Sequence, residues 1–356
     1  MVGTRDDASD GSEAWEANPT PRIAPIFVVG SGRSGTSLLR AMLVAHPRIH
    51  LAQEAMFFPW TRKAVPWESA DRRLERWLSS FSFAWLGIGA DKVRGRFPAP
   101  IAEDDLPAVY AWVLRELAAR HGKPRWGDKT PPHALYLEET FAAFPSARVI
   151  LVVRDPRDTV LSLETAPFTA GSRLALLFLG RALRHSVSRW QGRLHVVRLE
   201  DLADDPAATM RGVLAFVGEE WDDRVLAHHD HLPSGEPPYP WTRGAEKPLR
   251  AYRQRWPEAM GPAWVRIVER LAGGTMERHG YERAELPEEP GWGVVARAAL
   301  ADLPEAARFT ARAARLFFRL GRRPTGAAES QRLVLSLNPR SREAHPDWTL
   351  PDPPAR

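Results

Sequence analysis

The chain has 356 residues, 44% of them hydrophobic and 26% charged, which is the composition of a folded globular protein and excludes a collagen-like, coiled-coil or wholly disordered chain. It contains no cysteine, so disulfide scaffolds, thiolate zinc sites and cysteine nucleophiles are also excluded. The formal net charge of +5 favours affinity for anions, but no basic run is interleaved with aromatic residues as in a nucleic-acid-binding surface.

Residues 1–20 are acidic and rich in Ser and Gly, and we expect them to form a disordered tail. They hold no apolar segment of the kind that a secretory signal needs. The longest apolar runs of the chain, such as Leu174–Leu179, are far shorter than the roughly 20 residues of a membrane-spanning helix. These features predict a cytoplasmic protein.

Residues 21–290 alternate between apolar, strand-like runs and amphipathic helical segments. The first run, Ile26–Val29, is followed by a glycine-rich turn and by a predicted helix at Thr36–Ala45. The other predicted strands are Arg148–Val153 and His195–Leu199, and the other predicted helices are Leu74–Trp85, Leu106–Arg120, Pro132–Phe144, Arg173–Arg193, Pro206–Val217 and Trp264–Gly280. This alternation predicts an α/β domain whose central parallel sheet is flanked by helices.

Residues 291–356 are predicted to be an appendage made of one helix, Pro304–Leu320, and a Pro-rich tail. The arginines of this helix share one face, and its apolar residues, which include Phe309 and Ala313, fill the opposite face. We favour packing of the apolar face on the domain. The alternative is a peripheral membrane contact through residues 304–320.

The turn Gly30–Ser37 lies between a predicted strand and a predicted helix. Backbone N–H groups converge in such a turn and the helix N-terminus carries partial positive charge, so the pattern predicts a phosphate-binding loop. A nucleotide kinase would place a lysine where this chain has Thr36, and here the loop's cation is Arg33. We therefore predict an anion bound without a metal. A P-loop nucleotide kinase or nucleotide-binding protein is the alternative.

Two blocks of the sequence resemble one known family. Val28–Arg40, with its continuation Ala41–Pro47, resembles the 5′-phosphosulfate loop of sulfotransferases that use 3′-phosphoadenosine 5′-phosphosulfate (PAPS). It is most similar to the tyrosylprotein sulfotransferase branch and its bacterial relatives. Trp126–Pro131 and Phe144–Asp158 resemble the family's lysine segment and 3′-phosphate block, in the family's order. The resemblance implies a three-layer P-loop-type fold with a helical C-terminal appendage.

The resemblance also implies an activity and a role for each site residue. The activity is metal-independent transfer of a sulfuryl group from PAPS to a hydroxyl of a carbohydrate, lipid or small-molecule acceptor by in-line displacement. Glu54 matches the general base by position, Lys129 the catalytic lysine at the leaving oxygen, and Arg33 the cation at the phosphosulfate. The implied cofactor-binding residues are Gly32, Arg33, Ser34, Gly35, Thr36 and Ser37 at the 5′ end, Arg154 and Ser162 at the 3′-phosphate, and Lys247 in a loop over the nucleotide.

Simpler interpretations of these residues stay open. Glu54 can be an exposed loop carboxylate, and Lys129 can pair with Asp128. We expect Arg157 and Asp158 to form a capping ion pair, and we regard His133 as the next candidate base.

The sequence departs from the family in the region expected to bind the acceptor. Met56 stands where the peptide-sulfating branch has an arginine, and the apolar run Phe57–Trp60 follows it. Leu199 replaces an aromatic residue, so adenine contacts are not assigned. Four tryptophans, Trp60, Trp67, Trp77 and Trp85, occur in the region that would line the acceptor cleft, with core packing as the alternative for most of them.

Overall fold

The fold is described from a computed structural model of the chain. The structure describes residues 24–322 except 167, 168, 170, 234–241, 243, 246, 250 and 251, and the side chains of residues 316–322 are not described. The predicted acidic tail and the Pro-rich tail lie outside the described residues.

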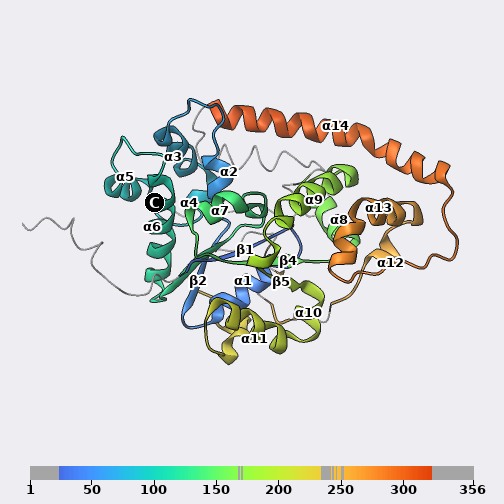
Figure 1. The fold of residues 1–356 in the computed structure, drawn as a ribbon, viewed down its shortest axis with the longest axis horizontal. Coiled ribbons are helices and arrows are strands. Elements are labelled where there is room, and N and C mark those ends of the chain that lie inside the picture. Colours follow the sequence, from blue (N-terminus) through green and yellow to red (C-terminus); the bar gives the residue numbers. More distant parts are fainter. Residues whose placement is uncertain are drawn as a thin grey trace, which may run out of the picture.

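A five-stranded parallel sheet forms the centre of the molecule (Figure 1). Its strand order is β2-β3-β1-β4-β5, and every neighbouring pair is parallel. The predicted strands are confirmed to within a residue as β1 (Ile26–Gly30), β4 (Arg148–Val153) and β5 (Leu194–Arg198). The sequence pattern does not predict β2 (Ile49–Gln53) or β3 (Arg125–Lys129), because both mix charged or polar residues with apolar ones.

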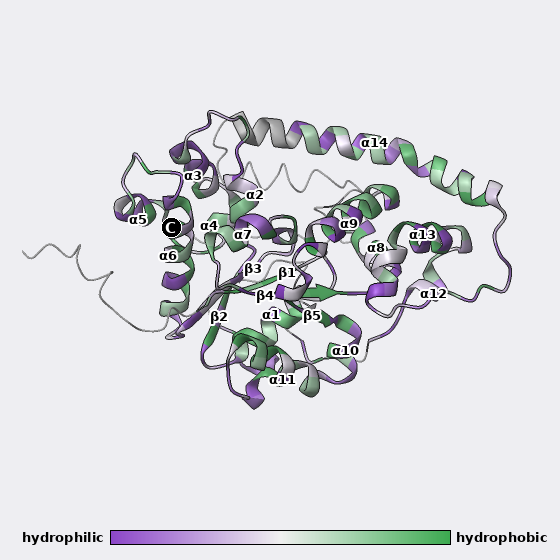
Figure 2. Cartoon of the chain, in the orientation of Figure 1, coloured by the Kyte–Doolittle hydropathy of each residue, from purple (hydrophilic) through white to green (hydrophobic). Residues whose placement is uncertain are grey.

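Residues of the central strands alternate between two apolar cores, one on each face of the sheet. Phe27 and Val29 of β1 belong to one core, and Ile26 and Val28 belong to the other. This period of two explains why β1 and the part of β4 after the exposed Arg148 are apolar, since both of their faces are covered. Figure 2 shows apolar residues along the strands and mixed hydropathy along surrounding helices such as α9 and α13.

The helices fall into two layers around this sheet (Figure 1). One layer contains α1 (Thr36–Ala45), α10 (Leu199–Asp204) and α11 (Pro206–Val217). The other contains α2 (Phe57–Thr61), α3 (Ala70–Leu78), α4 (Phe81–Ala84), α5 (Ala90–Arg96), α6 (Asp105–Arg120), α7 (Leu137–Ala143), α8 (Pro156–Glu164) and α9 (Arg173–Ser188). The three-layer architecture is therefore confirmed.

Two predicted helices are divided in the structure. The predicted helix Leu74–Trp85 is interrupted where Ser80 caps α4, its side chain accepting from the Phe83 N–H. The segment predicted as one helix from Pro132 begins instead with a 3₁₀ turn at Pro131–Leu135 and continues as α7.

The C-terminal region is helical and packs on the second layer. It comprises α12 (Trp256–Ala259), α13 (Pro262–Arg278) and the long α14 (Trp292–Arg322). α14 begins well before Pro304, so the expectation that this proline starts the helix is wrong. Phe309 and Ala313 pack against the domain, as the first interpretation of this helix predicts. Among the helices of the described residues, none is both long and apolar enough for a membrane span.

Candidate active site

The predicted site residues follow the carboxyl ends of four neighbouring strands. Arg33 follows β1, Glu54 follows β2, Lys129 ends β3 and Arg154 follows β4. β1 lies between β3 and β4, so the chain continues to one side of β1 after α1 and crosses to the other side after β3. Ligands of parallel α/β sheets bind at such a change of direction, beyond the carboxyl ends of the strands.

The loop after β1 fits only glycine at two positions. A Cβ on Gly30 would lie 2.4 Å from the Val152 carbonyl oxygen. Gly35 has φ +100°, and its Cβ would lie 2.6 Å from Cδ1 of Leu199, at the start of α10. Gly35 is also the N-cap of α1, and no side chain caps it. The first turn of α1 therefore presents backbone N–H groups without a capping side chain, as an anion site requires.

Lys129, Glu54 and Ser37 form one hydrogen-bonded group. The Lys129 Nζ donates to Glu54 Oε1 at 2.6 Å and to Ser37 Oγ at 3.3 Å. The Lys129 side chain is fully buried, whereas that of Glu54 is 19% exposed. Burial lowers the pKa of Lys129, and the Glu54 carboxylate opposes this shift. The structure thus joins the predicted base and the predicted lysine, and Lys129 pairs with Glu54 rather than with Asp128, the alternative partner.

Asp128, the residue before Lys129, and His133 form a buried pair next to this group. Asp128 is fully buried and accepts from the Tyr110 hydroxyl at 2.9 Å. His133 Nδ1 lies 3.3 Å from Asp128 Oδ2, but burial lowers the pKa of His133 to about 3, so its ring is neutral near pH 7. With only 1% of its surface exposed, His133 is poorly placed to take a proton from an acceptor.

A second group joins Arg33, Arg154 and Ser162. Arg154 Nη1 donates to the Arg33 carbonyl oxygen at 3.1 Å, and Arg33 Nε donates to Ser162 Oγ at 3.2 Å. Ser162 is brought close because α8 already begins at Pro156. Burial and the neighbouring Arg154 lower the pKa of Arg33, while Glu54 raises it. The charges of Arg33 and Arg154 repel each other, and an anion bound by both would offset that cost.

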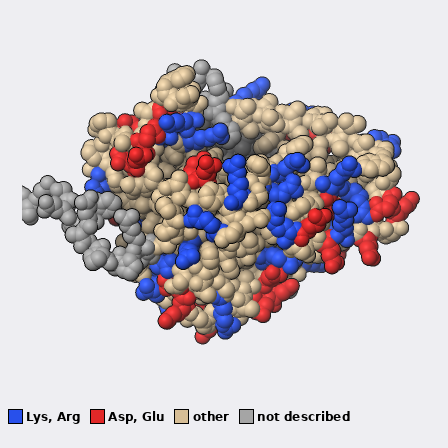
Figure 3. Space-filling view, in the orientation of Figure 1, with Lys and Arg blue, Asp and Glu red and all other residues tan. Residues whose placement is uncertain are grey.

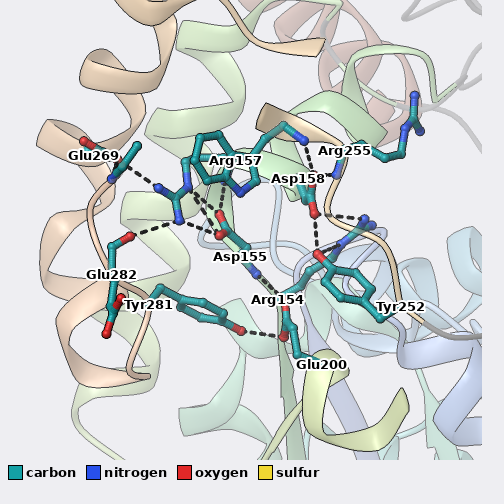
Figure 4. Close-up of polar contacts among 12 residues, drawn as sticks. Arg154, Asp155, Arg157, Asp158, Glu200, Tyr252, Arg255, Glu269, Tyr281 and Glu282 are labelled. Carbon is teal, nitrogen blue, oxygen red and sulfur yellow. Dashed lines mark hydrogen bonds and ion pairs between the residues drawn. The ribbon is translucent and has the colours of Figure 1, made fainter. Parts of the chain in front are cut away.

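Tyr252 and Asp158 extend this second group, and the sequence does not predict either contact (Figure 4). The Tyr252 hydroxyl donates to Asp158 Oδ2 and accepts from Arg154 Nε at 3.5 Å. Asp158 Oδ1 also accepts from the backbone N–H groups of Arg255 and Trp256, each at 2.9 Å. A pairing across more than 90 residues leaves no local pattern in the sequence by which it could be found.

The expected Arg157–Asp158 ion pair is wrong. Arg157 pairs instead with Asp155 at 2.7 Å and with Glu269 of α13 at 2.9 Å (Figure 4). Asp155, not Asp158, caps α8 by accepting from the Arg157 N–H. This buried network ties the turn after β4 to the C-terminal helices.

Lys247 is not brought into the site among the described residues. It is exposed, and its carbonyl oxygen lies 3.1 Å from His228 Nε2. Its role over the nucleotide stays a prediction.

The apolar run after Glu54 mostly forms core rather than a cleft wall. Phe57 is 2% exposed and stacks on Tyr110 with ring centroids 4.2 Å apart, whereas Met56 is partly exposed. Three of the four singled-out tryptophans, Trp60, Trp77 and Trp85, are buried, and Trp67 is 83% exposed. For the buried three, the core interpretation holds.

The sequence matches the model of a known protein family. The model described as "Sulfotransferase family" matches residues 25–223, more than half of the chain. The match includes β1 to β5 and hence both groups of site residues. The chain belongs to the sulfotransferase family. The resemblance drawn from the two sequence blocks is thereby confirmed.

Individual relatives of this sulfotransferase are known. Protein-tyrosine sulfotransferase 2 of Gallus gallus is 30% identical over 228 residues, 58% of this chain and 54% of that protein. Protein-tyrosine sulfotransferase 1 of Danio rerio is 29% identical over 224 residues, 58% of this chain and 56% of that protein. The chain therefore spans about half the length of these relatives.

The fold is also shared with a solved structure. The sulfotransferase domain of the Synechococcus PCC 7002 olefin synthase superposes with a TM-score of 0.51 at 19% identity. The superposition covers 74% of this chain and 96% of that domain. At this identity the likeness concerns the fold alone.

Proposed function

We propose that this sulfotransferase transfers a sulfuryl group from PAPS to a hydroxyl of its acceptor by in-line displacement, without a metal. The observation that carries the proposal is the contact of Lys129 with both Glu54 and Ser37. This contact supports a role for Glu54 as the base and for Lys129 as the cation beside the uncapped first turn of α1.

The residues present fit PAPS as the donor. The first turn of α1 offers N–H groups to the 5′-phosphosulfate, and the paired Arg33 and Arg154 offer charge-assisted hydrogen bonds to phosphate. Ser162 would hold the 3′-phosphate together with Arg154. A nucleotide kinase is less well supported, because Thr36 occupies the place of the phosphate-binding lysine.

When bound, PAPS supplies an electrophilic sulfur and a stable leaving group. Glu54 takes the proton of the acceptor hydroxyl, which makes the oxygen a better nucleophile. Lys129, fixed by Glu54 and Ser37, supplies positive charge to the oxygen that becomes negative as its bond to sulfur breaks. Arg33 neutralises the phosphosulfate at the start of the reaction.

The acceptor class is part of the proposal. The relatives are named for protein tyrosine, so a tyrosyl hydroxyl is the first acceptor to test. A hydroxyl of a carbohydrate, lipid or small molecule is the other class, because Met56 replaces the arginine that the peptide-sulfating branch carries after its base. A tyrosine peptide and a set of sugar and lipid hydroxyls, each offered with labelled PAPS, separate the two.

Calorimetry with adenosine 3′,5′-bisphosphate tests the donor assignment. We expect binding that EDTA does not change, and about 10- to 100-fold weaker binding for Arg33→Ala and Arg154→Ala, because each removes a charge-assisted hydrogen bond. Arg297→Ala, an exposed arginine on α14, is the matched control and should bind as the wild type does. Tighter binding of ATP with Mg²⁺ would contradict the proposal, as would equal affinity for adenosine 5′-phosphate.

A further inference from the structure

The turn that carries Glu54 has an unfavourable backbone conformation. Glu54 has φ +56° and Met56 has φ +52°. Side chains other than glycine seldom adopt this left-handed region, because Cβ crowds the backbone there. Across the described part of the chain, Arg33 is the one other non-glycine residue with positive φ. The strained non-glycine positions therefore coincide with the site.

Three consecutive residues, the last two of β3 and Thr130 after it, accept hydrogen bonds from three consecutive N–H groups of this turn. The Glu54 N–H donates to the Lys129 carbonyl oxygen at 2.8 Å. The Ala55 N–H donates to Asp128 Oδ1 at 3.2 Å, and the Met56 N–H donates to Thr130 Oγ1 at 3.3 Å. The carbonyl of the turn is held as well, since Trp77 Nε1 donates to the Ala55 oxygen at 2.8 Å. A conformation that is unfavourable by itself persists when its surroundings fix it in this way.

Asp128 is the charged member of this set. Its side chain points to the face of the sheet opposite to that of Lys129, because neighbouring residues of a strand alternate. Its second oxygen accepts from Tyr110, whose ring stacks on Phe57, the residue after the turn. A fully buried carboxylate is costly unless hydrogen bonds compensate it. Here the compensating donors are the Ala55 N–H of the turn, the Tyr110 hydroxyl and the Thr130 side chain.

We propose that Asp128 is a positioning residue, which acts through the Ala55 N–H to hold Glu54 against Lys129. The proposal rests on the proposed function, because Glu54 is the base in that function. Thr130 acts in the same way on the Met56 N–H. Neither side chain needs to touch the donor or the acceptor, so their loss should slow the chemical step without weakening donor binding.

Hydrogen–deuterium exchange and kinetics on Asp128→Ala, Asp128→Asn and Thr130→Val test the proposal. We expect Asp128→Ala and Thr130→Val to exchange the amides of Glu54–Met56 at least 10-fold faster, with β1 unchanged. We expect kcat to fall about 10- to 100-fold, while the affinity for adenosine 3′,5′-bisphosphate stays within 2-fold. Asp128→Asn keeps an acceptor for the Ala55 N–H and should recover most of both losses.

Thr61→Val is the matched control, because Thr61 is also buried but its hydroxyl bonds to Phe57 within its own helix. It should change neither exchange in the turn nor kcat. If Asp128→Ala does not fold, Thr130→Val still tests the idea, since it removes one hydroxyl and keeps the shape.

Unchanged exchange in the folded variants would overturn the proposal, and so would an equal loss of donor affinity and kcat. If the wild type transfers no sulfuryl group at all, the proposed function fails. The exchange result then still decides whether these side chains hold the turn.

Discussion

The charges of Lys129 and Glu54 depend on each other. A fully buried ammonium group is costly, and the Glu54 carboxylate offsets that cost while its own position is set by the ammonium. Charge on Glu54 therefore opposes the lowering of the Lys129 pKa by burial. Removing either charge changes both the base and the cation of the site.

Asp128 makes the stability of the protein depend on pH. Burial raises its pKa from 3.8 to about 6, although hydrogen bonds from Thr130, Ala55 and Tyr110 act in the opposite direction. The folded state thus binds this proton more tightly than the unfolded state. Its contribution to stability is complete below about pH 4 and is lost as pH rises through about 6.

We compare the unfolding free energy of the wild type minus that of Asp128→Asn at two pH values. We expect this difference to be about 2 kcal/mol more positive at pH 4.5 than at pH 7.5. Urea unfolding at the two pH values measures it. A difference that grows with pH would show that the ionised carboxylate is the stabilising form and would contradict this assignment.

At the residue scale, the sequence predicts site residues that lie at a fixed spacing from a motif, but it does not predict which distant residues the motif contacts. Glu54 is found by its distance along the chain from Arg33, and Lys129 by the threonine and proline that follow it. Tyr110 and Tyr252 are missed, because each reaches its aspartate from a distant helix or loop. The pairing of Arg157 with Glu269 is missed for the same reason.

At the scale of elements, the phosphate loop is held between α1 and α10. Leu199 contacts the loop where Gly35 lacks a side chain. The same leucine stands where the family has an aromatic residue. In this chain that position packs on the phosphate loop, whereas sequence comparison alone would assign it to a contact with adenine. The start of α10 therefore contributes to the shape of the loop.

Gly35→Ala should lower the unfolding free energy by about 1–3 kcal/mol, because it adds backbone strain and a contact with Leu199. It should also weaken binding of adenosine 3′,5′-bisphosphate at least 10-fold. Gly180→Ala is the control: Gly180 lies inside α9 with open space around it, so this change should stabilise by about 0.5–1 kcal/mol. Chemical denaturation and calorimetry measure both, and wild-type behaviour of Gly35→Ala would show that the loop is not constrained.

The elements that the sequence fails to predict are informative. β2 and β3 are short and contain Gln53, Asp128 and Lys129, which break the apolar pattern of a buried strand. Those polar residues stand near the carboxyl ends of the strands, where ligands of parallel sheets bind and where the candidate site lies. The apolar pattern therefore fails at the residues of the candidate site.

At the scale of the whole molecule, α14 joins the C-terminal region to the second helical layer. Ser172 and the Leu174 N–H both donate to Asp302, and Glu305 pairs with Arg308 and Arg312. Phe309 and Ala313 of this part of α14 pack on the domain. Figure 3 shows Lys and Arg side chains spread over one face of the molecule among Asp and Glu. The cytoplasmic location and the domain boundaries near residues 20 and 290 stay predictions.

Phe309→Ala should lower the unfolding free energy by about 1–3 kcal/mol, less than for a fully buried phenylalanine, because Phe309 is partly buried between α14 and the domain. Phe178→Ala, on α9, is the control, since Phe178 is 59% exposed and its loss should change stability little. Co-sedimentation with anionic vesicles adds a second comparison. Undiminished stability of Phe309→Ala together with lost vesicle binding would favour the membrane interpretation instead.

The most direct test of the central claim is to separate donor binding from chemistry with Glu54→Gln. We expect unchanged affinity for adenosine 3′,5′-bisphosphate and a fall in single-turnover sulfuryl transfer from PAPS by about 10²–10⁴, the usual contribution of a general base. Single-turnover measurement excludes masking by slow product release. Full transfer activity in Glu54→Gln, on an acceptor that the wild type sulfates, would contradict the account.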